Sequence, residues 1–195
     1  MDHTLETSRK PAPRGISRPG HPAFVGAVIG AVGGTVFVTA NAPALPAPWK
    51  TLAGIAGGVS LAVWCWTVLL ARRALPAPPR PGRSAGWIYL AGLAGMFAIM
   101  FVGSRILTGL DRVSVQPAVI VLAVGVHFLP YARAFGAPVF ARLGAALAVV
   151  GLLGLAAGLA ITPVAASAAA VIAGLVLLLG ISVDARTGAR QNPRL

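Results

Sequence analysis

Long stretches without a charged residue alternate with short segments that carry nearly all the charges. The uncharged stretches cover residues 19–49, 51–71, 84–104, 113–132 and 143–183. A helix of a soluble protein keeps a charged face, whereas a helix that crosses a bilayer needs about 20 consecutive, mostly apolar residues. The pattern therefore predicts an all-α fold, a polytopic integral membrane bundle of about six spanning helices.

Six spans follow from the breaks between these stretches. We expect them at about 23–42, 50–71, 85–105, 113–131, 139–161 and 163–183. The final stretch of 41 residues is divided at Thr162-Pro163, because a single helix of that length would extend about 60 Å, twice the hydrocarbon thickness. The spans form one membrane domain over 23–183, between a basic, proline-rich tail at 1–22 and a basic tail at 184–195.

The first span has a second interpretation as a cleaved signal peptide. A basic segment precedes it, and Ala40-Asn41-Ala42 follows the small-residue pattern of a cleavage site. Cleavage there would leave Pro43 as the first residue, which fits such a site poorly, and the basic segment is long. An uncleaved helix is favoured.

The basic residues predict the orientation. Of 16 Lys and Arg, thirteen fall on the side of the two termini, and Lys50, Arg105 and Arg112 fall on the other. Basic residues accumulate in cytoplasmic loops, so both termini are expected in the cytoplasm. Five spans would place the C-terminal arginines outside and weaken this asymmetry. The many Arg, Ala, Gly and Pro residues suggest a GC-rich bacterium, hence a bacterial inner membrane.

The net charge of +12 raises the possibility of nucleic-acid binding. The basic residues lie at helix ends, where they act as orientation signals, so no nucleic-acid partner is expected. The bilayer itself is the expected partner, with a second copy or another membrane protein as a further possibility.

Glycines recur every fourth residue along three of the predicted spans. Such small-residue stripes let helix backbones approach closely in lipid. They could pack helices within one chain or form the seam of a homodimer. The residues are Gly26, Gly30 and Gly34, then Gly54 and Gly58, then Gly154 and Gly158.

His127 is the most notable polar residue within a span. A histidine at membrane depth can titrate near neutral pH and relay a proton or bind a ligand. The alternative is a neutral imidazole hydrogen-bonded to a neighbouring helix. Pro130 lies three residues on and leaves the carbonyl of Val126 without its helical donor.

Arg105 is expected to end the third span. Its long side chain would extend to the outer interface and pair with Asp111, or else contact an anion there. Gln116, Ser104, Thr108 and Ser60 are expected to form hydrogen bonds between helices.

The sequence holds no recognisable catalytic or cofactor-binding constellation. Asp2, Glu6, Asp111 and Asp184 all lie in predicted tails or loops, so neither an intramembrane carboxylate nor a cluster of metal ligands is evident. Ser182 follows a Gly-x-Ser pattern of intramembrane serine proteases, but its position at the membrane edge argues against that chemistry. We therefore expect no metal, no cofactor and no enzymatic activity.

The segment Gly125-Val126-His127-Phe128-Leu129-Pro130-Tyr131-Ala132 resembles one in a family of small bacterial membrane proteins of unassigned function. The order of parts is also similar: a basic tail, two helices, a basic loop, two helices ending in this segment, and a hairpin. The resemblance implies a six-helix membrane domain and carries no catalytic residue over.

Two functions fit these observations. The first is a non-enzymatic accessory or structural membrane protein that acts through helix packing. The second is a small permease or channel, in which His127 and the helix break at Pro130 line a path. A membrane-embedded enzyme is the least favoured.

The predicted orientation can be tested with reporter fusions. Fusions after Lys50 and Asp111 should report a periplasmic location, and fusions after Arg80 and Arg190 a cytoplasmic one, because the basic residues favour the cytoplasmic side. A periplasmic signal at Arg190 would contradict the six-span arrangement.

Overall fold

The computed structural model describes residues 22–70 and 82–187. Residues 1–21 and 188–195 of the predicted tails lie outside them, as do residue 71 of the predicted second span and residues 72–81 of the basic loop that follows it. The described residues form helices and no strands. Six of the helices are long and apolar enough to cross a membrane, which confirms the predicted fold class. This outcome is expected physically, because a helix satisfies its own backbone hydrogen bonds in lipid.

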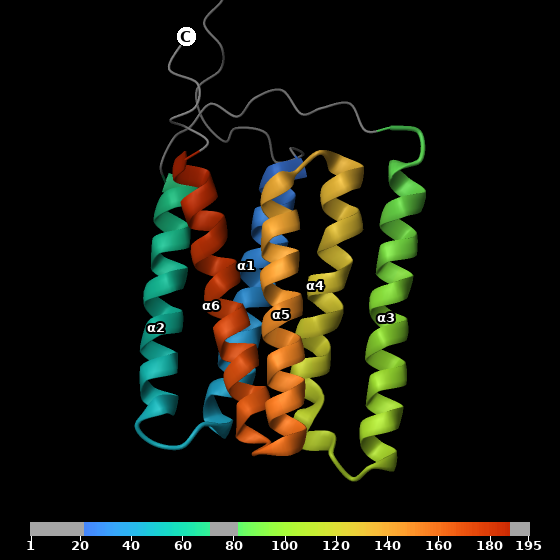
Figure 1. Cartoon of the computed structure of the whole chain (residues 1–195). Coiled ribbons are helices and arrows are strands. Elements are labelled where there is room, and N and C mark those ends of the chain that lie inside the picture. Colours follow the sequence, from blue (N-terminus) through green and yellow to red (C-terminus); the bar gives the residue numbers. More distant parts are fainter. Residues whose placement is uncertain (1–21, 71–81, 188–195) are drawn as a thin grey trace, which may run out of the picture.

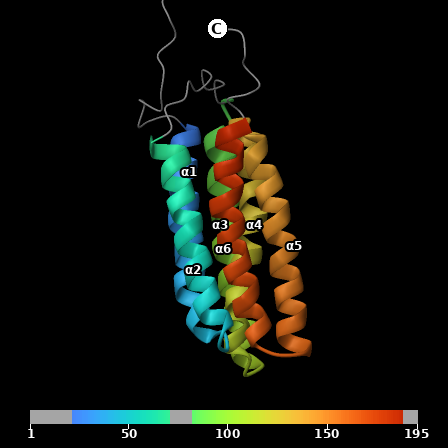
Figure 2. The same cartoon turned by 90° about the vertical axis from the view of Figure 1, so that its left-hand side faces the viewer.

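The helices follow one another with short connections. The six long helices are α1 (Pro22–Asn41), α2 (Trp49–Trp64), α3 (Ala85–Gly109), α4 (Gln116–Phe135), α5 (Pro138–Ala160) and α6 (Val164–Thr187). Three short elements flank them: η1 (Ala42–Ala44), the π-helical η2 (Cys65–Leu70) and η3 (Val113–Val115). Figures 1 and 2 show the long helices side by side, with α1 beginning and α6 ending at the same end of the bundle. We refer to that end as the N/C end.

Three helices extend well beyond their predicted spans. α6 continues past residue 183 to Thr187, so Asp184 lies within a helix and not in the predicted tail. α3 continues past the predicted end at Arg105 to Gly109, because Leu107 in that last turn packs into the protein and is only 3% exposed. α4 continues past residue 131, through Pro130, to Phe135. It ends where Gly136 adopts a left-handed conformation with φ of 60°, which favours glycine.

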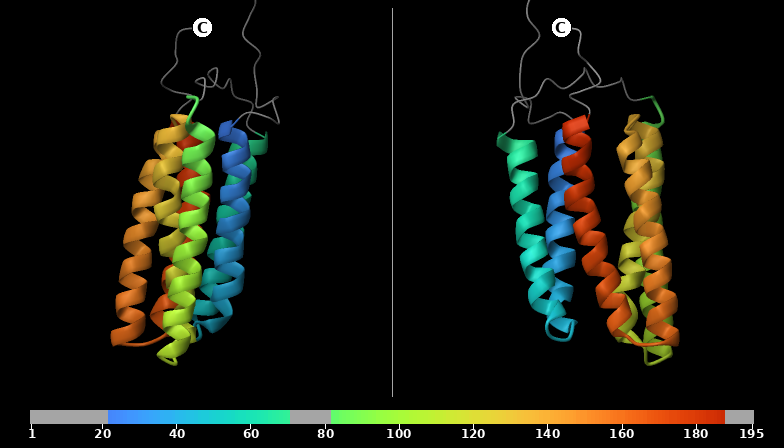
Figure 3. Two further views of the ribbon diagram at one scale, coloured as in Figure 1. Left: turned by 90° about the vertical axis from the view of Figure 1, so that its right-hand side faces the viewer. Right: turned by 60° about the vertical axis from the view of Figure 1, so that its left-hand side comes forward.

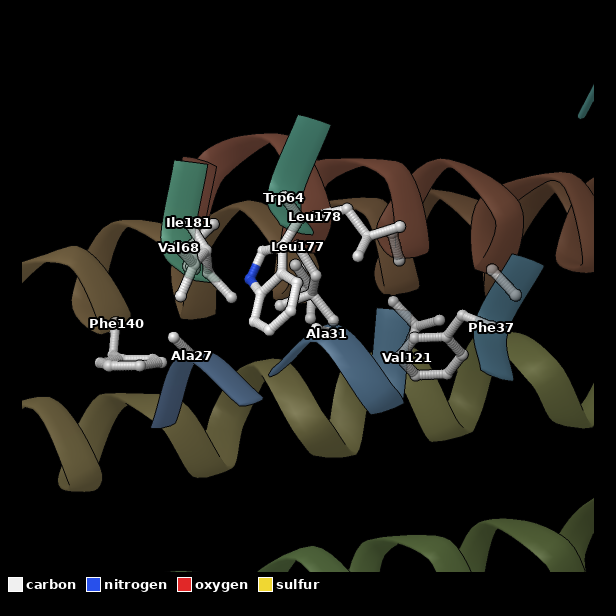
Figure 4. Close-up of a cluster of buried hydrophobic side chains, with 14 of the residues drawn as sticks. Ala27, Ala31, Phe37, Trp64, Val68, Val121, Phe140, Leu177, Leu178 and Ile181 are labelled. Atoms are coloured by element: carbon white, nitrogen blue, oxygen red, sulfur yellow. The ribbon is translucent and has the colours of Figure 1, made fainter. Parts of the chain in front are cut away.

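α6 is the central helix of the bundle. It packs against α1 and α2 on one side and against α4 and α5 on the other (Figure 3). Over an 18-residue apolar stretch of its span, 56% of the residues are buried, against 33% in the corresponding stretches of α1, α2, α4 and α5. Figure 4 shows part of the main core, where Leu177 and Leu178 of α6 meet Trp64 of α2 and Ala31 of α1.

α3 is the least buried of the six long helices. It sits at the edge of the bundle beside α4 (Figures 1 and 3), and its main contacts are with α4 and η3. Only Ala85 and Leu107 are buried among its 25 residues. The other five long helices therefore form a packed body, to which α3 is attached through one interface.

Glycine allows the closest helix contacts. At the α4–α5 interface, a methyl group added to Gly144 would lie 2.7 Å from the carbonyl oxygen of Gly125. At the α1–α6 interface, one added to Gly34 would lie 2.9 Å from the carbonyl oxygen of Gly174. Real Cβ atoms do not approach a backbone oxygen so closely, so these backbones meet only because the side chains are absent.

Most of the predicted glycine stripes pack within the chain. Gly26 and Gly30 of α1 face Phe140 and Ile181. Gly154 of α5 faces α6, and Gly158 faces Val115 of η3 as well as α6. The larger contacts at α4–α5, however, involve glycines outside the predicted stripes. Gly144 and Gly151 of α5 meet the backbone of α4 and lie seven residues apart, a spacing that also places side chains on one helix face.

The stripe on α2 behaves differently. An added methyl group at Gly54 or Gly58 would meet no described atom within 4 Å, so these glycines make no helix contact within the described chain. Gly57 is the glycine of α2 that does: a methyl group there would lie 2.7 Å from Val38 of α1. The four-residue spacing identified a glycine-rich helix but not the face that packs.

Most side-chain hydrogen bonds at the helices stay within one helix. Thr108 was expected to bond across helices, but its hydroxyl donates to the carbonyl of Ser104, 2.8 Å away on the same helix. Similar bonds return from Thr35, Thr39, Asn41, Thr67 and Ser182 to carbonyls three or four residues earlier. The hydrogen-bonding capacity of these side chains is used within their own helices. Helix association therefore depends on packing.

Alanine substitutions at two glycines test the role of these close contacts. Gly125→Ala should lower the free energy of unfolding in detergent by at least about 2 kcal/mol, since the new methyl group meets rigid backbone of α5. Gly54→Ala is the matched control on an open surface, and should leave the thermal midpoint unchanged or slightly raised. Equal midpoints for the two variants would contradict backbone packing at Gly125.

Candidate functional site

His127 lies at the interface between α3 and α4, in the half of the bundle nearest the N/C end. It stands eight residues before the end of α4 at Phe135. Its side chain is 9% exposed and faces Gly92 of α3, where an added methyl group would lie 3.2 Å from the Nδ1 atom. The absence of a side chain at Gly92 therefore makes room for the imidazole ring.

Pro130 lies beside His127 in the space that Gly92 leaves open on α3. A methyl group at Gly92 would lie 2.9 Å from the Cγ atom of Pro130. Proline inside a helix usually ends or kinks it, since the ring removes a backbone donor. Here α4 continues for five more residues, and the ring packs against α3. Pro130 thus helps to join two helices rather than to end one.

Aromatic side chains surround the histidine toward the N/C end. The ring of Tyr89, from α3, meets His127 edge-on with centroids 5.7 Å apart. Tyr89 also meets Tyr131 at 6.1 Å and Phe135 at 6.2 Å in the same geometry. Edge-to-face contacts of this kind contribute about 0.5–1.5 kcal/mol each. Tyr89 is consequently the main side chain by which this end of α3 is held to α4.

The predicted hydrogen bond from His127 to a neighbouring helix is not formed at Nδ1. That atom is buried and has no hydrogen-bond partner. A buried polar atom without a partner costs about 1–3 kcal/mol, so its presence in a packed interface is unfavourable for stability alone. This makes His127 the strongest candidate for a functional side chain among the predicted residues.

Two further buried side-chain polar atoms of the described residues lack partners. They are the Nε1 atom of Trp64, within the main core, and the Oε1 atom of Gln116, at the other end of α4. Gln116 was expected to bond between helices. Trp64 was not singled out from the sequence, because an aromatic residue in an apolar stretch gives no signal that its indole N–H will be buried.

Arg105 is not part of this site. It is exposed on α3, thirteen residues beyond Gly92, or about 20 Å along the helix axis. The expected ion pair with Asp111 is not formed in the described part of the chain. The ion pair that is present joins Arg142 of α5 to Asp184 of α6 at 3.6 Å, near the N/C end. Both side chains are well exposed, so its contribution to stability is small.

Within the described residues, no three His, Cys, Asp or Glu side chains gather as metal ligands would. Comparisons with protein-family models, curated proteins and solved structures gave no match to the chain. The resemblance to six-helix bacterial membrane proteins therefore stays a prediction from the sequence.

Substitutions of His127 distinguish its packing from its polarity. His127→Leu keeps much of the volume and removes the unpartnered nitrogen, so the thermal midpoint in detergent should equal or exceed that of the native protein. His127→Ala leaves a cavity and should cost about 2–3 kcal/mol. A large loss of stability in His127→Leu would show that the ring makes a stabilising hydrogen bond.

Proposed function

We propose that this multi-pass membrane protein is a non-enzymatic accessory protein, which acts by lateral association of its helices in the bilayer of a bacterial inner membrane. The observation that carries the proposal is the uneven burial of the helices. Five of them form one packed body, whereas only Ala85 and Leu107 are buried among the 25 residues of α3. The exposed surface of α3 is the part of the molecule best suited to contact another protein.

The open surface of α3 is rich in large apolar side chains. Trp87 is 76% exposed, Phe101 68% and Phe97 56%. Gly86 and Gly95 also face open space, since an added methyl group would meet no described atom within 4 Å. Aromatic ridges beside glycine gaps are suited to close packing against another membrane helix.

The chemistry of the spans supports a role without catalysis. The one carboxylate within the long helices as described is Asp184, which pairs with Arg142 near the N/C end. The mid-membrane carboxylates on which proton-coupled carriers commonly depend are not present in the sequence of the spans. Close helix packing is therefore the feature of the spans that supports a function.

A small permease or channel is the second candidate, and His127 is the observation that favours it. An unpartnered imidazole nitrogen beside a proline within a membrane helix is suited to a transport path. This alternative requires a flux across proteoliposome membranes that His127→Leu abolishes while the protein remains folded. An unchanged flux in that variant would exclude His127 from the path.

Site-specific photocrosslinking in cells tests the leading proposal. A photoreactive amino acid at Phe97 or Phe101 of α3 should give a discrete protein adduct, because this face would lie against a partner helix. The matched control is Leu152 or Leu153 of α5, which are equally exposed, at 54% and 65%, but belong to the packed body. Lipid adducts alone from both helices would contradict lateral association through α3.

Native mass spectrometry in a mild detergent then identifies the partner. A defined oligomer or a stoichiometric second protein would support the accessory role. A stoichiometric small molecule that is not a lipid would instead favour the permease.

A further inference from the structure

The α3–α4 interface is the joint at which the structure can open with the least loss of packing. α3 has its main contacts with α4 and η3, whereas α4 also packs against α5 and α6. Two glycines of α3 form the closest contacts: Gly92 against His127 and Pro130, and Gly103 against Val119. The connection from α3 through Leu110–Arg112 to η3 is short, so the opposite end of this interface is held by the chain itself.

His127 lies in the half of this interface that is farther from that short connection. It is nine-tenths buried, and its Nδ1 atom faces Gly92 with no hydrogen-bond partner. The neutral ring leaves one nitrogen without a partner there, but it brings no charge into the contact. A protonated ring would bring a full positive charge and a second N–H into the same apolar contact.

No described side chain near the ring is suited to neutralise that charge. The ionisable side chains of α3, α4 and α5 are Tyr89, Arg105, Tyr131, Arg133 and Arg142, and α1 contributes none. The nearest carboxylate along the N/C end belongs to Asp184 of α6, which pairs with Arg142. A buried charge without a partner costs several kcal/mol, a cost that falls when the group reaches water or lipid headgroups.

We propose that His127 is a proton-binding site that controls the docking of α3 on α4. With the ring neutral, Gly92 closes over His127 and Pro130, and Tyr89 packs edge-on against the imidazole. When the ring takes up a proton from water at the N/C end, that half of α3 separates from α4 and lets the imidazolium reach a polar environment. The movement pivots at the opposite end, where Gly103 meets Val119. This inference does not depend on the partner or on any flux.

Distance measurements between spin labels test the proposal. In a Cys65→Ser background, which removes the single cysteine, labels at Trp87→Cys on α3 and Val25→Cys on α1 report on the N/C end. A second pair, Ile106→Cys on α3 and Leu159→Cys on α5, reports on the opposite end. All four positions are exposed, so the labels disturb little packing.

The protein is reconstituted in lipid nanodiscs at about pH 8 and about pH 5, a range over which imidazoles gain their charge. The distance between positions 87 and 25 should lengthen by several ångströms at acid pH and recover at neutral pH. The distance between positions 106 and 159 should stay unchanged, because the pivot lies there.

His127→Leu and His127→Gln serve as paired variants that cannot take up the proton. Both should give the native distances at about pH 8 and lose the response of the 87–25 pair at acid pH. The proposal is overturned if that pair does not move in the native protein, or if it moves equally in both variants. His3 and His21 are retained throughout, so a response that survives in the variants would be assigned to other groups.

Discussion

The whole bundle depends on the closeness with which helix backbones can meet in lipid. Between membrane helices there is little hydrophobic drive, because lipid tails are as apolar as leucine. Dispersion contacts between closely packed backbones replace it, and they fall off steeply with distance. Gly125 against Gly144 and Gly34 against Gly174 allow this closeness at two interfaces that hold the five-helix body together. The polar side chains that bond back to their own helices leave these contacts to decide the arrangement.

The same constraint explains the different character of α3. Its two close contacts, at Gly92 and Gly103, meet side chains of α4 rather than backbone. Side chains can move with less cost than a helix backbone, so this interface can open and close more easily than the others. The buried imidazole of His127 lies at that interface, and not between the helices of the packed body. The imidazole would destabilise a rigid core. It lies instead at the interface whose contacts can separate most easily.

The sequence was sufficient for the fold class, because about 20 consecutive residues without charge are typical of a membrane-spanning helix and rare in a soluble one. It was less informative about helix ends. Arg105 and Pro130 suggested boundaries, yet a long arginine side chain can leave the apolar region while its helix continues, and proline can pack against a glycine on a neighbouring helix. Both effects depend on neighbouring helices, and the local sequence does not show which helices those are.

The candidate site was also only partly predictable. His127 stood out as a polar residue in an apolar span, but its partners Gly92 and Tyr89 lie more than thirty residues earlier and carry no signal of their own. The glycine stripes show the same limit. Spacing identified Gly26, Gly30 and Gly34 as a packing face, whereas on α2 the face that packs is that of Gly57 and not that of Gly54 and Gly58. Which face of a helix meets a neighbour is decided by the whole bundle.

The central position of α6 has a consequence for how the molecule assembles. α6 follows the other five long helices along the chain, yet it is the one that packs against α1, α2, α4 and α5 together. As the chain emerges during synthesis, the earlier helices enter the bilayer before the helix that joins them exists. Until α6 inserts, the helix surface at Gly34 and the indole ring of Trp64 face lipid or an insertion factor. α1 and α2 are therefore joined to α4 and α5 mainly once α6 is inserted, whereas α4 and α5 can pair with each other as soon as both are in the bilayer.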